Sequence, residues 1–324
     1  MSGTEGLPVV LIHRLPAFNL LFKSRFHTHF TLLNPPHDSP DSIHSFLSRH
    51  AASIRALVAV GPTPVNSQTL DLLSALEIVV CSSAGIDHVD LCECRRRGVL
   101  VTSAGNAFSE DVADYSVALL IDVLRRVSAG NRFARAGLWP QHGSYPLGSK
   151  LGGKRVGIVG LGSIGSEVAK RLAAFGCSIA YTSRKKKSAV SYPFYENVRD
   201  LAADSNVLIV CCALTDQTRR MISKDVMTAL GKEGVIVNVG RGALIDEKEL
   251  VQSLLRGEIG GAGLDVYENE PYVPEELFAL DNVVLSPHVA ALTPESFEAL
   301  QDVIIGNLLA FFSNKPLLSP VQLD

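Results

Sequence analysis

Short runs of β-branched and other apolar residues recur along the chain, each separated from the next by a stretch with helical spacing. Four runs lie in the N-terminal third, at residues 9–12, 56–60, 78–81 and 99–101. Six more follow later, at residues 156–159, 179–181, 207–211, 235–239, 263–266 and 283–285. This alternation predicts βαβ units whose parallel strands are buried on both faces. The sequence therefore predicts an α/β fold with two doubly wound parallel sheets.

The composition is that of a folded protein with two domains. Of the 324 residues, 47% are hydrophobic and 19% are charged, so both halves can bury a core. The formal net charge of −3 argues against a protein that binds the phosphate backbone of nucleic acids. No apolar run reaches the roughly 20 residues of a membrane-spanning helix, and we see no secretory signal, so we expect a cytoplasmic protein without a membrane partner.

The six cysteines lack the spacing of a disulfide scaffold or of paired zinc ligands. Most of them lie inside apolar runs. The close pair Cys92 and Cys94 fits two thiols on a helix better than a metal site. We therefore expect reduced thiols and no bound metal.

Two helices carry clear terminal signals. Asp246 and Glu249 have the spacing of an N-cap and its N3 partner, and Gly257 marks the end of that helix. Thr293 followed by Pro294 begins a long amphipathic helix that continues until Pro316. Composition alone does not show which of the two domains this last helix completes.

Residues 160–165 carry three glycines with the spacing of a dinucleotide-binding turn, between an expected strand and an expected helix. Gly160 allows the tight turn, Gly162 lets the main chain approach a pyrophosphate, and Gly165 lets the helix pack on the strand. The helix N-terminus adds N–H groups and a favourable dipole for the anion. We therefore predict a dinucleotide cofactor here rather than a glycine-rich turn without a ligand.

The residues after the second strand of this domain indicate which dinucleotide binds. Enzymes that use NAD place Asp or Glu there to bind the ribose 2′-hydroxyl. This chain instead has Ser183, Arg184 and Lys185, which offer a hydroxyl and positive charge to a 2′-phosphate. The alternative is a solvated basic loop, which we favour for Lys186 and Lys187. The prediction is NADP(H).

Three polar side chains follow the last strands of the second set. Arg241 comes after the run at 235–239, Glu270 after 263–266, and His288 after 283–285. The carboxyl ends of parallel strands share one edge of a sheet, and ligands bind at that edge. We therefore expect the three side chains to meet beside the cofactor.

These residue types suit the reduction of a 2-oxo acid. Arg241 can bind the substrate carboxylate through two parallel hydrogen bonds. His288 can give a proton to the oxygen that hydride transfer leaves negative, and Glu270 behind it favours the protonated ring. Each residue also has a structural alternative: a loop cap for Arg241, one more exposed acid for Glu270, and a structural histidine for His288. Their joint position favours the catalytic interpretation.

Longer segments resemble the D-isomer-specific 2-hydroxyacid dehydrogenases, and within them the plant-type NADPH-dependent glyoxylate/hydroxypyruvate and hydroxyphenylpyruvate reductases. The matching segments cover most of the chain from about Cys81 onward: CSSAGIDHVDL, VADYSVALLIDVLRR, GKRVGIVGLGSIGSEVAKRL, YTSRK, NVGRGALIDEKELV, GGAGLDVYENEP, NVVLSPHVA and KPLLSPVQ. The chain departs from the family after His288, where Val-Ala-Ala-Leu replaces the usual Gly and small polar residues. This departure leaves the choice of substrate open.

The resemblance implies a role for each site residue. Arg241 would bind the substrate carboxylate and carbonyl, His288 would donate the proton, and Glu270 would be its partner. The turn of Ser83, Ala84 and Gly85 would offer N–H groups to the substrate carboxylate, as a small-residue turn after a strand can do. Asp265 would contact the nicotinamide amide. The remaining cofactor contacts would come from Gly160, Leu161, Gly162, Ser163, Ile164, Gly165, Ser183, Arg184, Lys185, Val239, Gly240 and Arg241.

The resemblance also implies the arrangement of the domains. A Rossmann NADP-binding domain of residues 105–290 would be inserted into a flavodoxin-like substrate-binding domain of residues 1–104 and 291–324. The apolar helix pattern at residues 112–127 would lie at a homodimer interface, although the pattern alone is typical of a buried helix.

We therefore expect an enzyme that reduces hydroxypyruvate, glyoxylate or a similar small 2-oxo acid with NADPH to a D-2-hydroxy acid. The resemblance to plant enzymes links this reaction to photorespiration. Two alternatives stay open. One is the same chemistry on hydroxyphenylpyruvate, and the other is a non-catalytic, dinucleotide-sensing interaction protein of the same fold.

Overall fold

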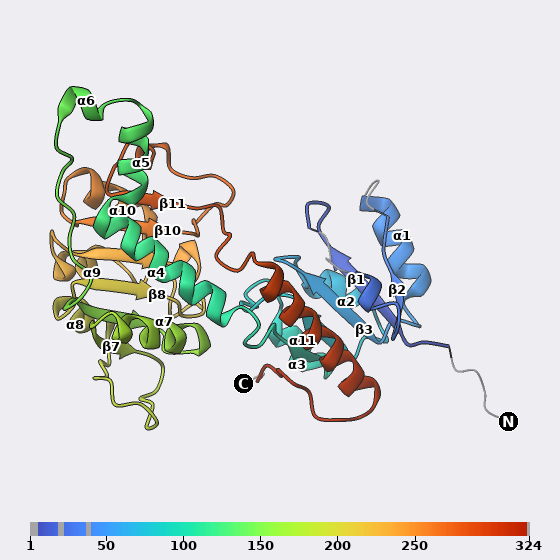
Figure 1. Cartoon of the computed structure of the whole chain (residues 1–324). Coiled ribbons are helices and arrows are strands. Elements are labelled where there is room, and N and C mark those ends of the chain that lie inside the picture. Colours follow the sequence, from blue (N-terminus) through green and yellow to red (C-terminus); the bar gives the residue numbers. More distant parts are fainter. Residues whose placement is uncertain (1–5, 19–22, 37–39, 323–324) are drawn as a thin grey trace. The chain divides into compact units, whose positions relative to one another are not determined.

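The computed structural model describes residues 6–18, 23–36 and 40–322, and the chain divides into two compact units. Unit 1 comprises the described residues up to Phe108 together with those from Thr293 onward, and unit 2 is Ser109–Leu292. The sequence placed the two boundaries after residues 104 and 290. Each unit contains its own parallel sheet, which confirms the expected α/β class (Figure 1).

Unit 1 is built on a five-stranded parallel sheet in the order β2-β1-β3-β4-β5, the order of a flavodoxin-like doubly wound fold. Its strands are β1 (Val9–Arg14), β2 (Thr31–Leu33), β3 (Ala56–Val60), β4 (Ile78–Cys81) and β5 (Leu100–Thr102). The sequence analysis missed β2. This strand has only three residues, none of them fully buried, so its apolar pattern is too short to recognise.

Helices cover both faces of this sheet. The helices α1 (Pro40–His50), α2 (Ser67–Leu72) and α3 (Leu91–Arg97) contribute Leu47, Leu70 and Cys94 to the core on one face. On the opposite face α11 (Pro294–Phe312) packs against β4 (Figure 1). The short helix η1 (Lys23–Arg25) contacts α11 through an ion pair of Arg25 with Asp302. Thr293 caps α11 as predicted, because its side chain accepts a hydrogen bond from the N–H of Ser296. The last helix therefore completes unit 1.

Unit 2 is built on a six-stranded parallel sheet in the order β11-β10-β9-β8-β6-β7. All six expected strands are present, as β6 (Arg155–Val159), β7 (Ser178–Thr182), β8 (Val207–Val210), β9 (Val235–Asn238), β10 (Gly261–Leu264) and β11 (Val283–Leu285). The strands β8 and β9 are buried along their whole length, as expected for a parallel sheet with helices on both faces.

Two groups of helices enclose the sheet of unit 2. On one face α4 (Ser109–Arg125), the apolar helix expected at 112–127, packs one side against α7 (Ser163–Ala174) and β10. Its place in a dimer stays a prediction. The other face carries α8 (Val198–Ala203), α9 (Lys224–Leu230) and α10 (Glu247–Leu255). Asp246 caps α10 as predicted, since its side chain accepts the N–H of Glu249. The short helices η2 (Gly242–Leu244) and η3 (Glu275–Leu277) lie in loops after strands.

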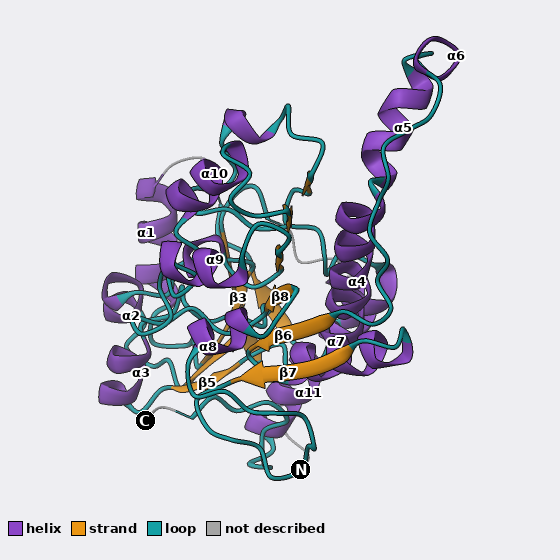
Figure 2. Cartoon of the chain, turned by 90° about the vertical axis from the view of Figure 1, so that its left-hand side faces the viewer, coloured by secondary structure: helices purple, strands orange, loops and turns teal. Residues whose placement is uncertain are grey.

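A two-helix arm, residues 127–147, projects away from the sheet of unit 2 (Figure 2). It contains α5 (Val127–Arg135) and α6 (Trp139–His142), and it begins where Arg126 adopts a left-handed conformation with φ of 56° and ends α4. The ring of Phe133 contacts the ring of Tyr145, with centroids 5.2 Å apart. Trp139 is 67% exposed, and Leu147 is 96% exposed. The arm therefore presents large apolar side chains to solvent.

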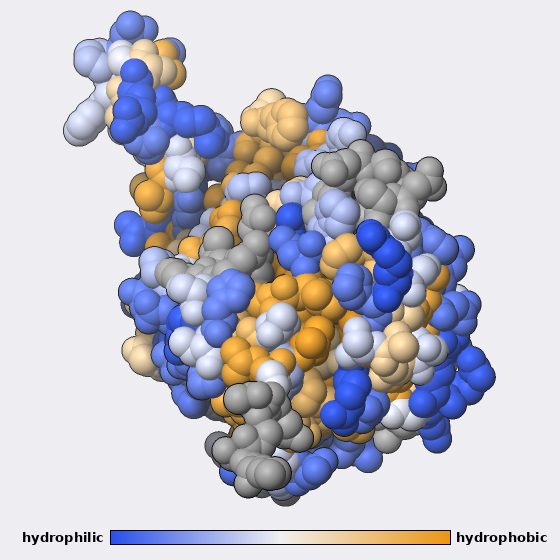
Figure 3. Space-filling view, turned by 90° about the vertical axis from the view of Figure 1, so that its right-hand side faces the viewer, coloured by the Kyte–Doolittle hydropathy of each residue, from blue (hydrophilic) through white to orange (hydrophobic). Residues whose placement is uncertain are grey.

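Apolar side chains also gather at the centre of the face shown in Figure 3, bordered by hydrophilic ones.

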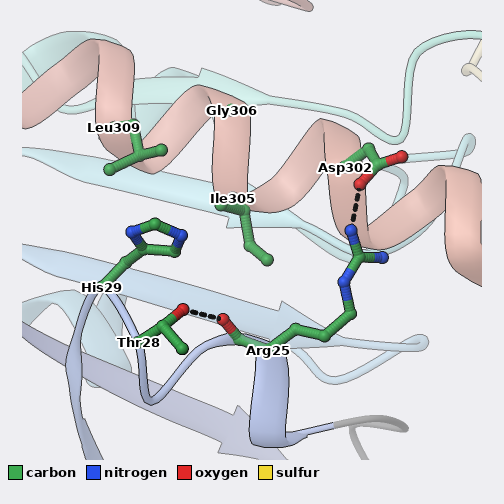
Figure 4. A pocket seen from close by; sticks show the side chains of 7 residues that line it. All are labelled: Arg25, Thr28, His29, Asp302, Ile305, Gly306 and Leu309. Carbon is green, nitrogen blue, oxygen red and sulfur yellow. Dashed lines mark hydrogen bonds and ion pairs between the residues drawn. The ribbon is translucent and has the colours of Figure 1, made fainter.

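Unit 1 has a hollow of about 420 Å³ between the η1 region and α11 (Figure 4). Arg25 forms an ion pair with Asp302 there, and His29 and Leu309 also line it. None of the predicted site residues contributes to this hollow. No helix in the described part of the chain is long and apolar enough to cross a membrane.

Candidate active site

The predicted residues of unit 2 follow the carboxyl ends of its strands, which lie along one edge of the sheet. Ser183 follows β7, Gly160 follows β6, and Arg241 follows β9. Asp265 comes directly after β10, and His288 follows β11. All of these strands are parallel, so the residues are arranged along this edge in the spatial order of the strands.

The glycine turn is closely packed at Gly160 and Gly165 and open to solvent at Gly162. Gly160 has a φ of 99°, and a Cβ there would lie 2.6 Å from the Cα of Cys212. A Cβ at Gly165 would lie 2.1 Å from the carbonyl oxygen of Gly160, so α7 begins in direct contact with the turn. A Cβ at Gly162 would meet nothing within 4 Å, and this glycine is the N-cap of α7. The space that its missing side chain leaves fits a pyrophosphate at a helix N-terminus.

The other residues predicted for this part of the site differ in exposure. Ser163 is exposed and Ile164 is half-buried at the start of α7, whereas Leu161 is only 1% exposed. Val239 is buried directly after β9. The structure thus places Ser163, Ile164 and Gly162 at the open side of the turn, and Leu161 and Val239 on its packed side.

The loop after β7 presents positive charge to solvent. The hydroxyl of Ser183 donates a hydrogen bond to the carbonyl oxygen of Lys185 at 2.8 Å, which folds the loop tightly. Arg184 and Lys185 are exposed. The side chain at the tip of β7 is therefore polar and uncharged, and the next two are cationic, a set that suits a phosphate rather than a ribose hydroxyl.

Two cysteines that the sequence analysis did not assign to the site support the glycine turn from β8. The thiol of Cys211 donates to the carbonyl oxygen of Gly160 at 3.2 Å, and its main-chain N–H donates to Val159 at 3.0 Å. Burial raises the pKa of Cys211 far above its ordinary value and that of Cys212 to about 11. Both thiols are therefore neutral packing groups at neutral pH.

His288 and Glu270 form a hydrogen-bonded pair, as predicted from their positions. The Nδ1 atom of His288 lies 2.7 Å from Oε2 of Glu270, and Oε1 of Glu270 accepts the main-chain N–H of Tyr267 at 3.1 Å. Burial acts to raise the pKa of Glu270, but the bond from His288, the N–H of Tyr267 and the charge of Arg241 together hold it below its ordinary value. The carboxylate is thus ionised and accepts a hydrogen bond from the N–H at Nδ1, which leaves Nε2 as the nitrogen that can exchange a proton.

Arg241 stands between two closely packed glycines, of which Gly242 leaves no room for a side chain. A Cβ at Gly242 would lie 1.9 Å from the carbonyl carbon of Tyr267, and a Cβ at Gly240 would lie 2.8 Å from the side chain of Leu244. The buried amide of Asn238 donates to the carbonyl oxygen of Arg241 at 2.9 Å. The main chain at Arg241 is therefore fixed, and its guanidinium is close enough to Glu270 to lower the pKa of that carboxyl group.

The carboxylate of Asp265 organises the turn that carries His288. It is 1% exposed and accepts hydrogen bonds from the hydroxyl of Ser286 at 2.7 Å and from the N–H groups of Val289 and Ala290 at 2.9 and 3.0 Å. The carbonyl oxygen of Asp265 also accepts the N–H of His288 at 2.8 Å. His288 itself has a φ of 55°, a left-handed conformation that needs such support. The resemblance assigned Asp265 to the nicotinamide amide, and the structure gives its carboxylate these partners within the protein.

The sequence analysis missed two further polar groups that support the site. The hydroxyl of Tyr267 lies 3.1 Å from the carbonyl oxygens of both Leu264 and Ser286, and so connects the ends of β10 and β11. Asn238 holds the turn before Arg241, where its side-chain oxygen accepts the N–H of Gly240 at 3.1 Å. The signal that could have identified Asn238 is a polar residue at the end of a fully apolar strand.

The turn predicted to bind the substrate carboxylate lies in unit 1, after β4. The hydroxyl of Ser83 donates to the carbonyl oxygen of Gly85 at 2.8 Å, and the carbonyl oxygen of Ser83 accepts the N–H of Ala104. Ala84 at the tip is exposed. Its role toward a substrate stays a prediction.

Sequence comparison identifies the family. Residues 117–290 match the family described as D-isomer specific 2-hydroxyacid dehydrogenase, NAD binding domain. A glyoxylate/hydroxypyruvate reductase of Arabidopsis thaliana is 55% identical over 324 residues, which cover all of both chains. The chain belongs to the D-isomer specific 2-hydroxyacid dehydrogenases. The resemblance predicted from the motifs is thus confirmed, and unit 2 of the dehydrogenase contains its NAD(P)-binding domain.

Two further proteins are similar to the dehydrogenase. A hydroxyphenylpyruvate reductase of Plectranthus scutellarioides is 48% identical over 276 residues, which cover 85% of this chain and 88% of that one. The crystal structure of an NADPH-dependent glyoxylate/hydroxypyruvate reductase from Sinorhizobium meliloti, in complex with NADP and malonate, superimposes with a TM-score of 0.89. It is 34% identical and the match covers 98% of each chain.

We expect Asp265→Asn to lower kcat by about 10- to 100-fold. The amide nitrogen would face a main-chain N–H that now donates to a carboxylate oxygen, and the turn that carries His288 would shift. Steady-state kinetics with a 2-oxo acid measure the effect. The matched variant Ser286→Ala leaves the two main-chain hydrogen bonds in place, so its kcat should fall less than about threefold. A KM for the dinucleotide that rises while kcat holds would instead favour a nicotinamide contact for Asp265.

We expect the contribution of Glu270 to the free energy of unfolding to disappear in acid. Its pKa is lower in the folded protein than the ordinary value of 4.5, so its contribution is fully present above pH 4.5 and is lost as the pH falls through the lower, folded pKa. The midpoint of thermal unfolding of Glu270→Gln should therefore lie below that of the wild type at pH 7 and approach it below pH 4.5. The exposed Glu276→Gln is the control. A gap that stays constant across this range contradicts the assignment.

Proposed function

We propose that the dehydrogenase reduces glyoxylate and hydroxypyruvate with NADPH to the corresponding D-2-hydroxy acids. The observation that carries this proposal is the hydrogen-bonded pair of Glu270 and His288, with Arg241 close to it, at the sheet edge that also carries the glycine turn. The relative from Arabidopsis thaliana and the structure from Sinorhizobium meliloti both carry the name glyoxylate/hydroxypyruvate reductase, which supports the choice of substrates.

Arg241 binds and orients the substrate in this proposal. A planar guanidinium donates two parallel hydrogen bonds to a carboxylate, and it also polarises the neighbouring carbonyl oxygen. Its main chain is fixed by Gly240, Gly242 and Asn238. The protein therefore loses little conformational entropy when the oxo acid binds. This fixed position favours one orientation of the carbonyl carbon.

His288 supplies the proton. The glycine turn and the basic loop would hold a nicotinamide dinucleotide, which would supply a hydride to the carbonyl carbon, and the carbonyl oxygen would then need a proton. Nδ1 of His288 is held by the ionised carboxylate of Glu270, so Nε2 donates its proton to that oxygen. The negative charge of Glu270 stabilises the protonated ring before the transfer.

The basic loop, residues Ser183–Lys187, supports NADPH as the reductant. It has no carboxylate for a ribose 2′-hydroxyl, and its exposed Arg184 and Lys185 can pair with a 2′-phosphate. The similar enzyme from Sinorhizobium meliloti is described as NADPH-dependent and holds NADP in its crystal structure.

Hydroxyphenylpyruvate is the second candidate substrate. It is supported by the 48% identical reductase from Plectranthus scutellarioides and by the apolar Val-Ala-Ala-Leu that follows His288. A non-catalytic, dinucleotide-sensing protein is the third alternative. An ionised Glu270 hydrogen-bonded to a histidine favours catalysis over this alternative.

Steady-state rates over a panel of oxo acids test the proposal. We expect kcat/KM for hydroxypyruvate and glyoxylate to exceed that for hydroxyphenylpyruvate. We also expect kcat/KM for NADPH to exceed that for NADH. A higher kcat/KM for hydroxyphenylpyruvate would make the aromatic acid the substrate. No turnover with any oxo acid, together with tight binding of NADPH, would favour the sensing protein.

Variants of the two central residues separate their roles in this assay. His288→Ala should lower kcat by about 100- to 10,000-fold with a smaller change in KM, because it removes the proton donor. Arg241→Ala should also raise KM for the oxo acid about 10- to 100-fold, since a charged hydrogen bond is lost. Arg241→Lys, which keeps the charge but loses the paired geometry, should be intermediate. An unchanged KM in Arg241→Ala would contradict its assignment.

We further propose that the dehydrogenase is a homodimer in which the arm contacts a second copy. The exposed Trp139 and Leu147 on this projection support an interface. The arm, residues 127–147, contains no Asp or Glu, and Arg132 and Arg135 make it basic, with Arg132 paired to Asp281 of the same chain at 2.7 Å. In the same unit the exposed Glu275 and Glu276 and the exposed Tyr272 and Phe278 offer both negative charge and apolar surface to the arm of another copy.

Light scattering on the purified protein tests the dimer. We expect a mass of twice 34.8 kDa for the wild type. A variant with Trp139→Glu and Leu147→Glu should shift toward the mass of one chain, because charges would replace the apolar contact. The control Leu255→Glu changes a leucine that is 48% exposed elsewhere on unit 2 and should keep the dimer. A wild-type mass of one chain contradicts the proposal.

A further inference from the structure

Tyr181 is a buried tyrosine in the edge strand β7, two residues before the basic loop. It is 0% exposed and is among the largest fully buried side chains of the described chain. Its ring packs against Phe194, with centroids 5.4 Å apart. The strand β7 is the outermost strand of its sheet and pairs only with β6 within that sheet. Tyr181 therefore anchors the outer edge of the sheet next to the loop that leaves it.

The chain leaves β7 at Ser183 and returns along the same strand ten residues later (Figure 1). The N–H of Tyr181 donates to the carbonyl oxygen of Pro193 at 3.0 Å, and the N–H of Tyr195 donates to the carbonyl oxygen of Tyr181 at 2.9 Å. The main chain of Tyr181 thus holds the returning segment in place. Its backbone bonds define where the excursion begins and ends.

The hydroxyl of Tyr181 holds the middle of the excursion. It accepts a hydrogen bond from the main-chain N–H of Lys187 at 2.8 Å, at the far end of the basic loop. The hydroxyl of Ser183 closes the near end through its bond to the carbonyl oxygen of Lys185. Because residues 184–189 are all exposed, they have few packing contacts of their own, and these two bonds fix the loop.

We propose that Tyr181 is a positioning residue that sets the preference for a dinucleotide with a 2′-phosphate. The inference rests on the proposed use of NADPH. Tyr181 acts through the main chain: its hydroxyl orders the basic loop before the ligand arrives, so Ser183, Arg184 and Lys185 bind the phosphate without first losing loop entropy. A dinucleotide that lacks the 2′-phosphate does not use this loop and gains nothing from its order.

Binding of two nucleotide fragments to the protein without dinucleotide measures this effect separately from turnover. The probes are 2′,5′-ADP, which carries the 2′-phosphate, and 5′-AMP, which lacks it, with dissociation constants from calorimetry. Tyr181→Phe keeps the ring contact with Phe194 and removes only the hydroxyl. We expect it to raise the dissociation constant of 2′,5′-ADP by about 3- to 10-fold, the effect of one hydrogen bond, and that of 5′-AMP by less than about twofold.

A double-mutant cycle shows whether Tyr181 acts through the loop. Arg184→Ala removes a phosphate partner directly, and we expect Tyr181→Phe to have a much smaller effect on 2′,5′-ADP in that background. Effects that multiply independently, or an equal weakening of both probes by Tyr181→Phe, would assign Tyr181 a general structural role and overturn the inference.

A second pair of variants tests the same hydrogen bond from its other end. Lys187→Pro removes the N–H that donates to Tyr181, whereas Lys187→Ala removes only an exposed side chain and keeps the N–H. We expect Lys187→Pro to reproduce the selective loss and Lys187→Ala to show little of it, even if Tyr181→Phe folds poorly. The inference is overturned if Lys187→Pro binds 2′,5′-ADP as the wild type does.

Limited digestion with trypsin reports the order of the loop without any nucleotide. Trypsin cleaves after Arg and Lys, and residues 184–187 are all Arg or Lys and are exposed. Cleavage there should be faster in Tyr181→Phe than in the wild type, and equal rates would count against the inference. A wild type that binds 2′,5′-ADP no more tightly than 5′-AMP would instead show that the proposed choice of NADPH fails, and the inference with it.

Discussion

The common direction of the six strands in unit 2 is the constraint on which the active site depends. Every loop that follows a strand emerges at the same edge, so residues separated by more than a hundred positions in the sequence lie along one edge of the sheet. The glycine turn after β6 and His288 after β11 are related in this way. An antiparallel strand among them would have sent one of these loops to the opposite edge.

The sequence could predict the features that repeat a local rule. The strands of unit 2, the caps of α10 and α11 and the glycine turn depend on the nearest few residues, and all appear where they were expected. The pairing of Glu270 with His288 was also predictable, because the order of the strands fixes which loops meet.

The features that the sequence did not reveal depend on contacts between distant residues. Asp265 accepts bonds from a turn more than twenty positions away, and a buried aspartate after a strand looks the same in the sequence whether it binds a ligand or a turn. The hydroxyl of Tyr181 is hidden in an otherwise ordinary apolar strand. The strand β2 was missed because three partly exposed residues carry no periodic signal.

The burial of Cys211 and Cys212 beside the glycine turn affects how readily their thiols react. With a pKa of about 11, the thiol of Cys212 is a thiolate in only about one molecule in 10⁴ at neutral pH. Peroxides and alkylating reagents attack the thiolate form, so they react with this position slowly. We therefore expect the packing beneath the glycine turn to persist in the presence of such reagents.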